Sequence, residues 1–321
     1  RFADHFGQAV AGIFTDEPQY GRNQIPWSFT LQEQYEKAYG ADLLEQLPLL
    51  FLEGRDHEQI RYRFWQLVTQ LFSQSFMQQI GDWCEEKGIR LTGHVVSEDH
   101  LTAQTGAVGD AMASYEYMQV PGIDWLGRFI DNPITPKQVS SVAHQLGQKF
   151  VLSETFGCSG WNVSFADLKW IAEWQYVHGI NLMCQHLQGY SLRGIRKRDY
   201  PPSLYYQQPW WNQYHQFNDY FGRLSMLLAE STVEAEILLL HPIRSSWLVY
   251  NHPVDGADAS IQSEQQDGQD RGERINEDFA RISEWLGALH YGHDYGSETI
   301  MEHHGRIEGE RLVVGQAAYS T

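Results

Sequence analysis

The sequence alternates between short apolar runs and longer segments with helical spacing, and this alternation constrains the fold most strongly. We expect five strands, at residues 11–15, 89–96, 115–120, 149–153 and 179–184. Between them, helical spacing predicts helices at residues 30–46, 56–87, 136–147 and 164–178. Strands that alternate with helices in this way form parallel sheets. The fold class is therefore predicted to be α/β.

Polar and acidic residues follow the expected strands, which is typical of a (β/α)8 TIM barrel with its site on the carboxyl face of the sheet. A doubly wound sheet usually carries a glycine-rich phosphate loop after its first strand, and the sequence has none there. A complete barrel needs eight strands, whereas only five precede residue 230. We therefore predict the C-terminal portion of a barrel, about strands 4 to 8.

The character of the chain changes near residue 230. A buried strand begins at Glu234, followed by a polar stretch at 252–272, a helix at 275–290 and short strands at 298–303 and 311–314. We expect two domains, a partial barrel at 1–230 and the start of a flavodoxin-like α/β domain at 231–321. The chain is then a fragment, which we expect to be inactive alone because an open five-stranded sheet exposes its edges.

Composition narrows the range of partners. A net charge of -18 repels phosphate backbones, so we expect no nucleic-acid partner. No segment approaches the ~20 apolar residues of a membrane span, so no membrane partner is expected. The three widely spaced cysteines read as buried thiols in a cytoplasmic protein, although the chain begins with Arg1 and an export signal stays open. Composition does not predict the oligomeric state.

Two glutamates are the strongest candidates for catalysis. Glu17 follows the first strand beside Asp16, and a neighbouring acid raises the proton affinity of one of the pair, which suits a general acid. Glu154 ends an apolar run and precedes the flexible segment 155–157. Carboxylates at the ends of barrel strands face one cavity, where a glycosidase needs them. The alternative for Glu17 is a helix N-cap.

Further polar residues lie in or just after other expected strands and are candidates for binding sugar hydroxyls, supplying a second base, or holding a hard cation. They are His94, Glu98, Asp99, His100, Glu116 and His186. For each of them a structural role stays open. Trp161 is a candidate platform for a sugar ring, whereas Trp170 and Trp174 are expected in the core. The basic tract 191–199 either pairs with acids of the site, recognises an acidic sugar or forms a solvated loop.

Several motifs together resemble large bacterial proteins of glycoside hydrolase family 106, the α-L-rhamnosidases. They are Thr15-Asp16-Glu17-Pro18, Thr92-Gly93-His94, Pro121-Gly122-Ile123-Asp124, Ser153-Glu154-Thr155 and Ser191-Leu192-Arg193-Gly194. The resemblance covers about residues 10 to 230. The segment around His241-Pro242 is similar to the flavodoxin-like domain that follows the barrel of family 42 β-galactosidases.

This resemblance implies an inverting glycosidase that acts on an oligosaccharide or glycoside. Glu17 would protonate the leaving oxygen, while Glu154, with Glu116, would activate water; Glu98 is the alternative second carboxylate. Substrate contacts would come from Asp16, His94, Glu98, Asp124, Trp161 and His186. The residues alone indicate no required cofactor and do not identify a metal, but the family resemblance implies that calcium could be bound.

Other functions stay open at the level of sequence. One is a retaining β-galactosidase-like glycosidase, and another is a sugar-binding barrel without activity. A third is a metal-dependent barrel hydrolase that uses His94, Asp99, His100 and His186.

Overall fold

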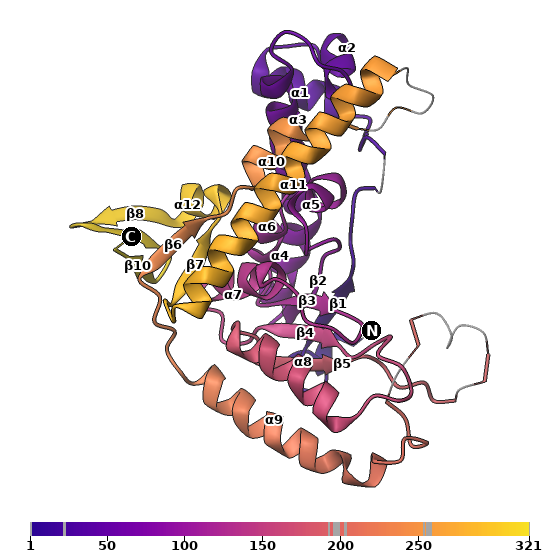
Figure 1. Cartoon of the computed structure of the whole chain (residues 1–321). Coiled ribbons are helices and arrows are strands. Elements are labelled where there is room, and N and C mark those ends of the chain that lie inside the picture. The colour runs from indigo at the N-terminus through magenta and orange to yellow at the C-terminus, as the bar shows by residue number, and fades with distance from the viewer. Residues whose placement is uncertain are drawn as a thin grey trace.

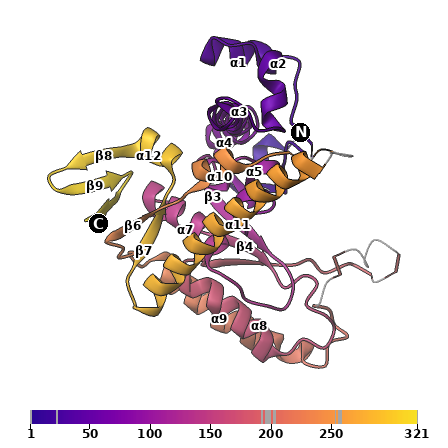
Figure 2. The ribbon, with the colours of Figure 1, turned by 45° about the horizontal axis from the view of Figure 1, so that its top comes forward.

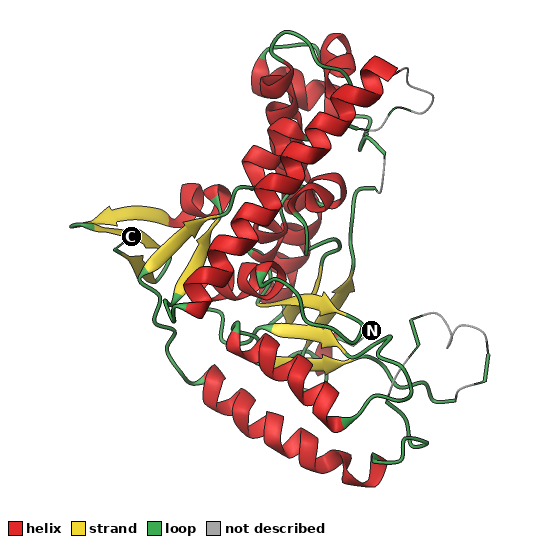
Figure 3. Ribbon diagram, viewed as in Figure 1, coloured by secondary structure: helices red, strands yellow, loops and turns green. Residues whose placement is uncertain are grey.

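The computed structural model describes residues 2–21, 24–191, 193–194, 200–201, 204–252, 254 and 259–320. A curled parallel sheet lies at its centre with helices outside it, and a smaller unit with its own strands lies to one side (Figures 1 and 3). The curled sheet has the form of half a barrel, so the prediction of an α/β fold with part of a TIM barrel is confirmed.

The central sheet has five parallel strands in the order β1-β2-β3-β4-β5. They are β1 (Gly12–Asp16), β2 (Arg90–His94), β3 (Val120–Trp125), β4 (Leu152–Thr155) and β5 (Leu182–Gln185). Gly93 has a φ of +130°, and a Cβ at this position would lie 1.9 Å from the carbonyl oxygen of Thr15. Only glycine therefore lets β1 and β2 approach each other here.

Helices join or follow these strands, and some of them pack on the sheet while others extend away from it (Figure 1). They are α1 (Leu31–Tyr39), α2 (Leu43–Gln46), α3 (His57–Phe72), α4 (Gln79–Glu86), α5 (Leu101–Ala107), α6 (Ala111–Tyr115), α7 (Ile134–Leu146), α8 (Phe165–Val177) and α9 (Tyr214–Ala229). A π-helical turn, Ser73–Gln78, joins α3 to α4, and 3-10 turns span Ala3–His5, Leu47–Leu50 and Trp211–Gln213. Ser164 caps α8 in a reciprocal capping box with Asp167, at the residue where the sequence predicted that this helix begins.

One strand was misplaced. The prediction of a strand at 115–120 was wrong, because α6 runs to Tyr115 and β3 begins at Val120. Pro121 and Gly122 lie inside β3, and both residue types are uncommon within strands, which hid the true boundary. The carboxyl end of this strand therefore lies at Trp125.

The smaller unit begins with a parallel pair, β6 (Ile237–Leu240) and β7 (His293–Gly296). Between these strands lie α10 (Ile243–Val249) and the long α11 (Ala259–Ala288), so the expected polar stretch 252–272 is largely helical. The strand expected at 298–303 is also wrong, because α12 (Glu298–His304) occupies it. An antiparallel sheet of β8 (Gly305–Glu308), β9 (Arg311–Val314) and β10 (Ala317–Tyr319) follows, and β9 matches the prediction.

This unit packs closely against the half-barrel. Helix α10 contacts α3 and α5, α11 contacts α5, and β7 contacts α7 (Figure 2). Trp247 of α10 is buried, and its indole Nε1 donates a hydrogen bond to the Gly109 carbonyl oxygen at 2.9 Å. The two parts therefore share core residues.

Some residues expected in the core lie at the surface. The side chain of Trp170 is 47% exposed, whereas Trp174 packs against the core, so the expectation is wrong for the first. Cys84 is buried as expected, but Cys158 is exposed and Cys184 is partly exposed. Among the described residues, no helix combines the length and the apolar character needed to cross a membrane.

Candidate active site

Strand register places polar side chains side by side at the carboxyl edge of the sheet. Asp16 at the end of β1 is paired with His94 at the end of β2. Asp124 in β3 is paired with Glu154 in β4. Because parallel strands present their carboxyl ends at one edge, these four residues form one cluster on the face where barrels carry their sites.

His94 links two of the carboxylates. Its side chain is 1% exposed, and its Nε2 lies 2.8 Å from Oε2 of Glu154 and 3.6 Å from Oδ1 of Asp16. Burial alone would lower the pKa of His94, but the hydrogen bond to Glu154 and the charges of Glu98, Asp124 and Glu154 raise it to about 9. The imidazole is therefore protonated at neutral pH.

The same contact determines the charge of Glu154. The hydrogen bond from His94 lowers the pKa of this carboxyl against the opposing effect of burial, and the charges of His94 and His186 lower it further. His186 Nε2 lies 3.8 Å from Oε1 of Glu154. Glu154 is consequently an ionised carboxylate, held at one edge of the cluster by two imidazoles.

Glu98 lies buried behind Asp124. Tyr115 donates a hydrogen bond from its hydroxyl to Oε1 of Glu98 at 2.5 Å, and the Asp124 amide donates to Oε2 at 3.1 Å. Burial outweighs these bonds and raises the pKa of Glu98 to about 8. The carboxyl is therefore mostly protonated at neutral pH.

Asp124 also holds its proton unusually tightly. Burial, together with the charges of Glu154, Glu17 and Asp16, raises the pKa of this carboxyl to about 7 despite the charge of His94. Its Oδ1 is buried and makes no hydrogen bond within the described residues. Buried polar atoms are normally satisfied, so this oxygen is available to a ligand.

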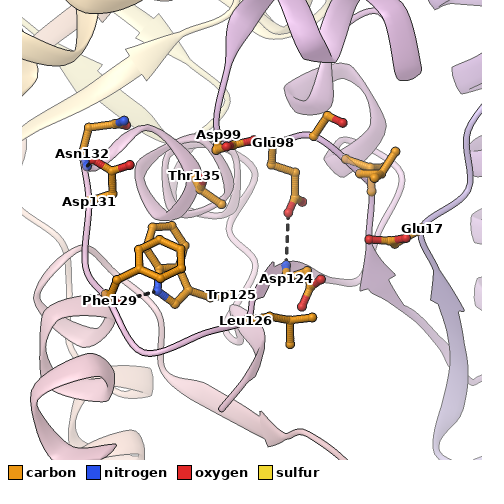
Figure 4. Close-up of a pocket in the computed structure, with 13 residues that line it drawn as sticks. Glu17, Glu98, Asp99, Asp124, Trp125, Leu126, Phe129, Asp131, Asn132 and Thr135 are labelled. Atoms are coloured by element: carbon orange, nitrogen blue, oxygen red, sulfur yellow. Dashed lines mark hydrogen bonds between the residues drawn. The ribbon is translucent and has the colours of Figure 1, made fainter. Parts of the chain in front are cut away.

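A pocket of about 190 Å³ opens beside Asp124 and Glu98 (Figure 4). Glu17, Trp125, Leu126, Phe129, Asp131 and Asn132 are among its lining residues, and the carboxylate of Glu17 points toward Asp124. This volume is below the ~300–1,000 Å³ of sites for drug-sized ligands. It therefore suits a single small ring.

Glu17 adopts a strained backbone conformation. Its φ is +48°, a left-handed value that costs a non-glycine residue about 1 to 3 kcal/mol. Ser97, Phe156 and Cys158 also have positive φ values, and they follow β2 and β4 on the same face. Strain of this kind gathers at functional sites because the surrounding structure holds it in place.

The structure thus brings together most of the residues singled out from the sequence, namely Asp16, Glu17, His94, Glu98, Asp124, Glu154 and His186. Their chemical roles stay predictions.

Three other candidates lie elsewhere. The placement expected for Glu116 was wrong, because this residue precedes β3 and its carboxylate contacts His303 and His304. His100 Nε2 pairs with Glu273 on α11 at 2.7 Å, which separates it from His94. Trp161 is exposed and is not among the residues that line the pocket. Of the basic tract 191–199, residues 192 and 195–199 lie outside the described residues.

Sequence reasoning missed Tyr115, which holds Glu98, and the segment from Trp125 to Asn132 that lines the pocket. Both omissions follow from the misplaced third strand. Had the carboxyl end of β3 been placed at Trp125, the residues after it would have been predicted as a loop on the face where barrels carry their sites.

A parallel half-barrel with a carboxylate cluster at the carboxyl ends of its strands defines the class of this chain, part of a β/α barrel with a candidate site on that face. The sequence model of glycoside hydrolase family 106, described as alpha-L-rhamnosidase, matches residues 2–244. The chain belongs to this family, and the resemblance found in the sequence is confirmed.

Similar proteins are considerably longer than this chain. A putative beta-glucuronidase from Formosa agariphila is 25% identical over 250 residues, which cover 74% of this chain and 20% of that protein. The rhamnosidase from Novosphingobium sp. PP1Y has a similar structure, with a TM-score of 0.63 and 20% identity over 92% of this chain and 26% of its own. The chain therefore spans about a fifth to a quarter of these relatives.

A second solved structure, the beta-galactosidase from Rahnella sp. R3, has a TM-score of 0.55 and 14% identity. The match covers 92% of this chain and 46% of that protein. At these low sequence identities, the two structural similarities show a shared fold and nothing more.

Proposed function

We propose that this chain carries the acid–base pair of a glycosidase that removes a terminal α-L-rhamnosyl residue. The observation that carries the proposal is the ionised Glu154, which is paired in strand register with Asp124, together with Glu17, which lines the same pocket as Asp124. Family membership and the likeness to the Novosphingobium rhamnosidase support rhamnose as the sugar.

In this proposal Glu154 is the general base and Glu17 the general acid. A carboxylate kept ionised by His94 has a free lone pair that can accept the proton of an attacking water molecule. Glu17 directs its carboxylate into the pocket, where the leaving oxygen would lie (Figure 4). Water attack on the face opposite the leaving group gives inversion, and NMR of the first-formed anomer tests this.

Asp124 and Glu98 would bind the sugar. The unpaired Oδ1 of Asp124 is an acceptor for one hydroxyl, and the protonated Glu98 lines the same pocket. Asp16, His94 and His186 would orient Glu154, while Trp161 stays a candidate platform at longer range.

Calcium, which the family resemblance allows, does not fit the group formed by Asp16, His94 and Glu154. The ligand atoms of Asp16, His94 and Glu154 lie within 4.8 Å of one another. Calcium prefers six to eight oxygen ligands, whereas one of these three groups offers nitrogen. No proposed step uses the ion.

The parallel pair β6 and β7, with α10 and α11 between them, supports a flavodoxin-like identity for residues 231–321. We include that assignment, and a boundary near residue 230, in the proposal.

The decisive experiment measures turnover of an aryl α-L-rhamnoside by the full-length protein and its variants. Glu17→Gln and Glu154→Gln are each expected to lower kcat by about 10²- to 10⁴-fold, because each removes a proton-transfer group. Glu277→Gln, an exposed residue of α11, is the control and should retain wild-type turnover.

Hydrolysis that survives both active-site substitutions would sink the proposed function. An aryl β-galactoside belongs in the same panel, since the likeness to the Rahnella enzyme makes retaining β-galactosidase-like hydrolysis the second candidate. Turnover of that substrate with retention would favour it over rhamnoside cleavage. A protein that binds rhamnose without hydrolysing either glycoside would instead be a binding barrel.

A further inference from the structure

A second cluster of ionisable side chains lies away from the pocket, between the half-barrel and the smaller unit. Glu116 follows α6 and precedes β3, while His303 and His304 end α12. Oε1 of Glu116 lies 2.9 Å from Nδ1 of His303 and 2.8 Å from Nε2 of His304. Two imidazoles from one unit thus meet one carboxylate from the other.

Two consecutive histidines reach one carboxylate because the helix ends with them. Residue 305 is extended, and a Cβ there would lie 2.3 Å from the carbonyl oxygen of Met301, so glycine is required. The His304 carbonyl accepts a hydrogen bond from the Gly315 amide, which fixes the turn. The two rings lie at 79° to each other and present Nδ1 of one and Nε2 of the other.

We propose that Glu116, His303 and His304 form a zinc site that joins the two parts of the chain. Their ligand atoms already lie within 4.8 Å of one another. Around a tetrahedral zinc ion with bonds of about 2.0 to 2.2 Å, ligand atoms lie about 3.3 Å apart. The carboxylate-to-imidazole separations of 2.8 to 3.1 Å are close to this value, so the carboxylate and each imidazole need to move apart only slightly to admit the ion.

The chemistry of the three ligands selects the ion. Imidazole nitrogens bind zinc and similar transition metals well, whereas calcium and magnesium favour all-oxygen sites. A cavity of about 180 Å³, lined by Glu116 and His303, adjoins the cluster and has room for a water as fourth ligand.

Neighbouring charges do not oppose a cation. Arg244 is the nearby basic residue in this cavity, and both oxygens of Glu302 accept hydrogen bonds from its guanidinium at 2.6 and 2.7 Å. Oε2 of Glu298 also lies 3.6 Å from Nε of the same guanidinium. The arginine is thus neutralised by acids, and Glu116 stays available to a metal.

The site would act on stability and not on hydrolysis. It lies before β3, whereas the candidate active site lies beyond the carboxyl ends of the strands. A bound ion would tie α12 to the end of α6 and raise the stability of the folded state by binding it preferentially.

The test is calorimetric titration of zinc sulfate into metal-stripped protein, together with melting temperatures with and without zinc. We expect one zinc per chain at this site. The His303→Ala/His304→Ala variant should lose that binding event and the zinc-dependent rise in Tm. Glu116→Gln, which keeps the shape of the side chain, should weaken binding by more than about 100-fold, because even partners outside the ligand shell contribute about 10- to 100-fold.

His100→Ala is the matched control, since it removes a single imidazole–carboxylate pair with Glu273 and should leave zinc binding unchanged. Zinc held by Asp16, His94 and Glu154 would survive the double substitution, so the two sites are distinguished. His303 and His304 are both partly exposed, and their replacement opens no core. Equal zinc stoichiometry and affinity in wild type and double variant, or no zinc binding by wild type, would overturn the site.

Discussion

At the scale of single residues, His94 determines the charge of the site because it touches carboxylates on both sides. Its imidazole is protonated in the folded protein up to a pH of about 9, whereas a histidine in an unfolded chain titrates near 6.5. The folded state therefore binds this proton more tightly. Stability from this source is fully present below pH 6.5 and is lost as the pH rises to about 9.

This pKa difference predicts a measurable dependence of stability on pH. It corresponds to about 3 kcal/mol, since each pKa unit represents about 1.36 kcal/mol. Urea denaturation of wild-type protein should show the free energy of unfolding decreasing between pH 6.5 and 9. The pKa of Glu98 is raised from 4.5 to about 8, so this carboxyl also lowers the free energy of unfolding as the pH rises through that range.

The variant His94→Gln should lack the histidine part of that loss, so the two curves converge as the pH rises. His215→Gln, which replaces an exposed histidine, is the control and should follow the wild-type slope. Parallel curves for wild type and His94→Gln would show that His94 is not the titrating group.

At the scale of elements, the close approach of β1 and β2 depends on Gly93. Gly93→Ala places a methyl group against the Thr15 carbonyl and forces a left-handed φ on alanine. We expect a loss of about 2 to 4 kcal/mol in the free energy of unfolding. Chemical denaturation measures this loss.

Gly222→Ala is the matched glycine control, because it lies inside α9 and an added Cβ meets nothing within 4 Å. Alanine there should be neutral or stabilise the protein by about 0.5 to 1 kcal/mol. Equal effects of the two substitutions would contradict a special role for Gly93.

The sequence predicted those helices and strands whose residues match the usual pattern for their type. Helix α8 was readable because Ser164 and Asp167 form a capping box before an apolar run. Strand β3 was not recognised, because proline and glycine have low strand propensity. Pro121 and Gly122 are held extended by pairing with β2 and β4. That error hid the loop which lines the pocket.

The candidate site was also predicted only where the sequence carries a local signal. Glu17 and Glu154 were found because strand ends gather on one face of a parallel sheet, which is a local signal combined with a topological rule. The contact of His94 with Glu154 joins residues 60 positions apart and carries no local signal. The convergence of Glu116 with His303 and His304 was hidden for the same reason, and because α12 had been predicted as a strand.

At the scale of the whole molecule, the half-barrel and the smaller unit behave as one body in their packing. Trp247 of α10 is 1% exposed, and its ring lies 5.9 Å from that of Tyr62 in α3. Oε1 of Gln138 in α7 accepts a hydrogen bond from Nε2 of the buried His241 at 2.8 Å. Core contacts of this kind make the unfolding of the two parts cooperative.

Trp247→Ala is therefore expected to destabilise both parts together, by about 3 to 5 kcal/mol, through the cavity it leaves. Hydrogen exchange measured by mass spectrometry should show peptides from β4 and from β7 losing protection to the same extent. Trp285→Ala removes a tryptophan that is 60% exposed on α11, so it should change stability by less than about 1 kcal/mol. If β4 kept its protection while β7 lost it, the units would unfold separately, and the boundary near residue 230 would mark two independent domains.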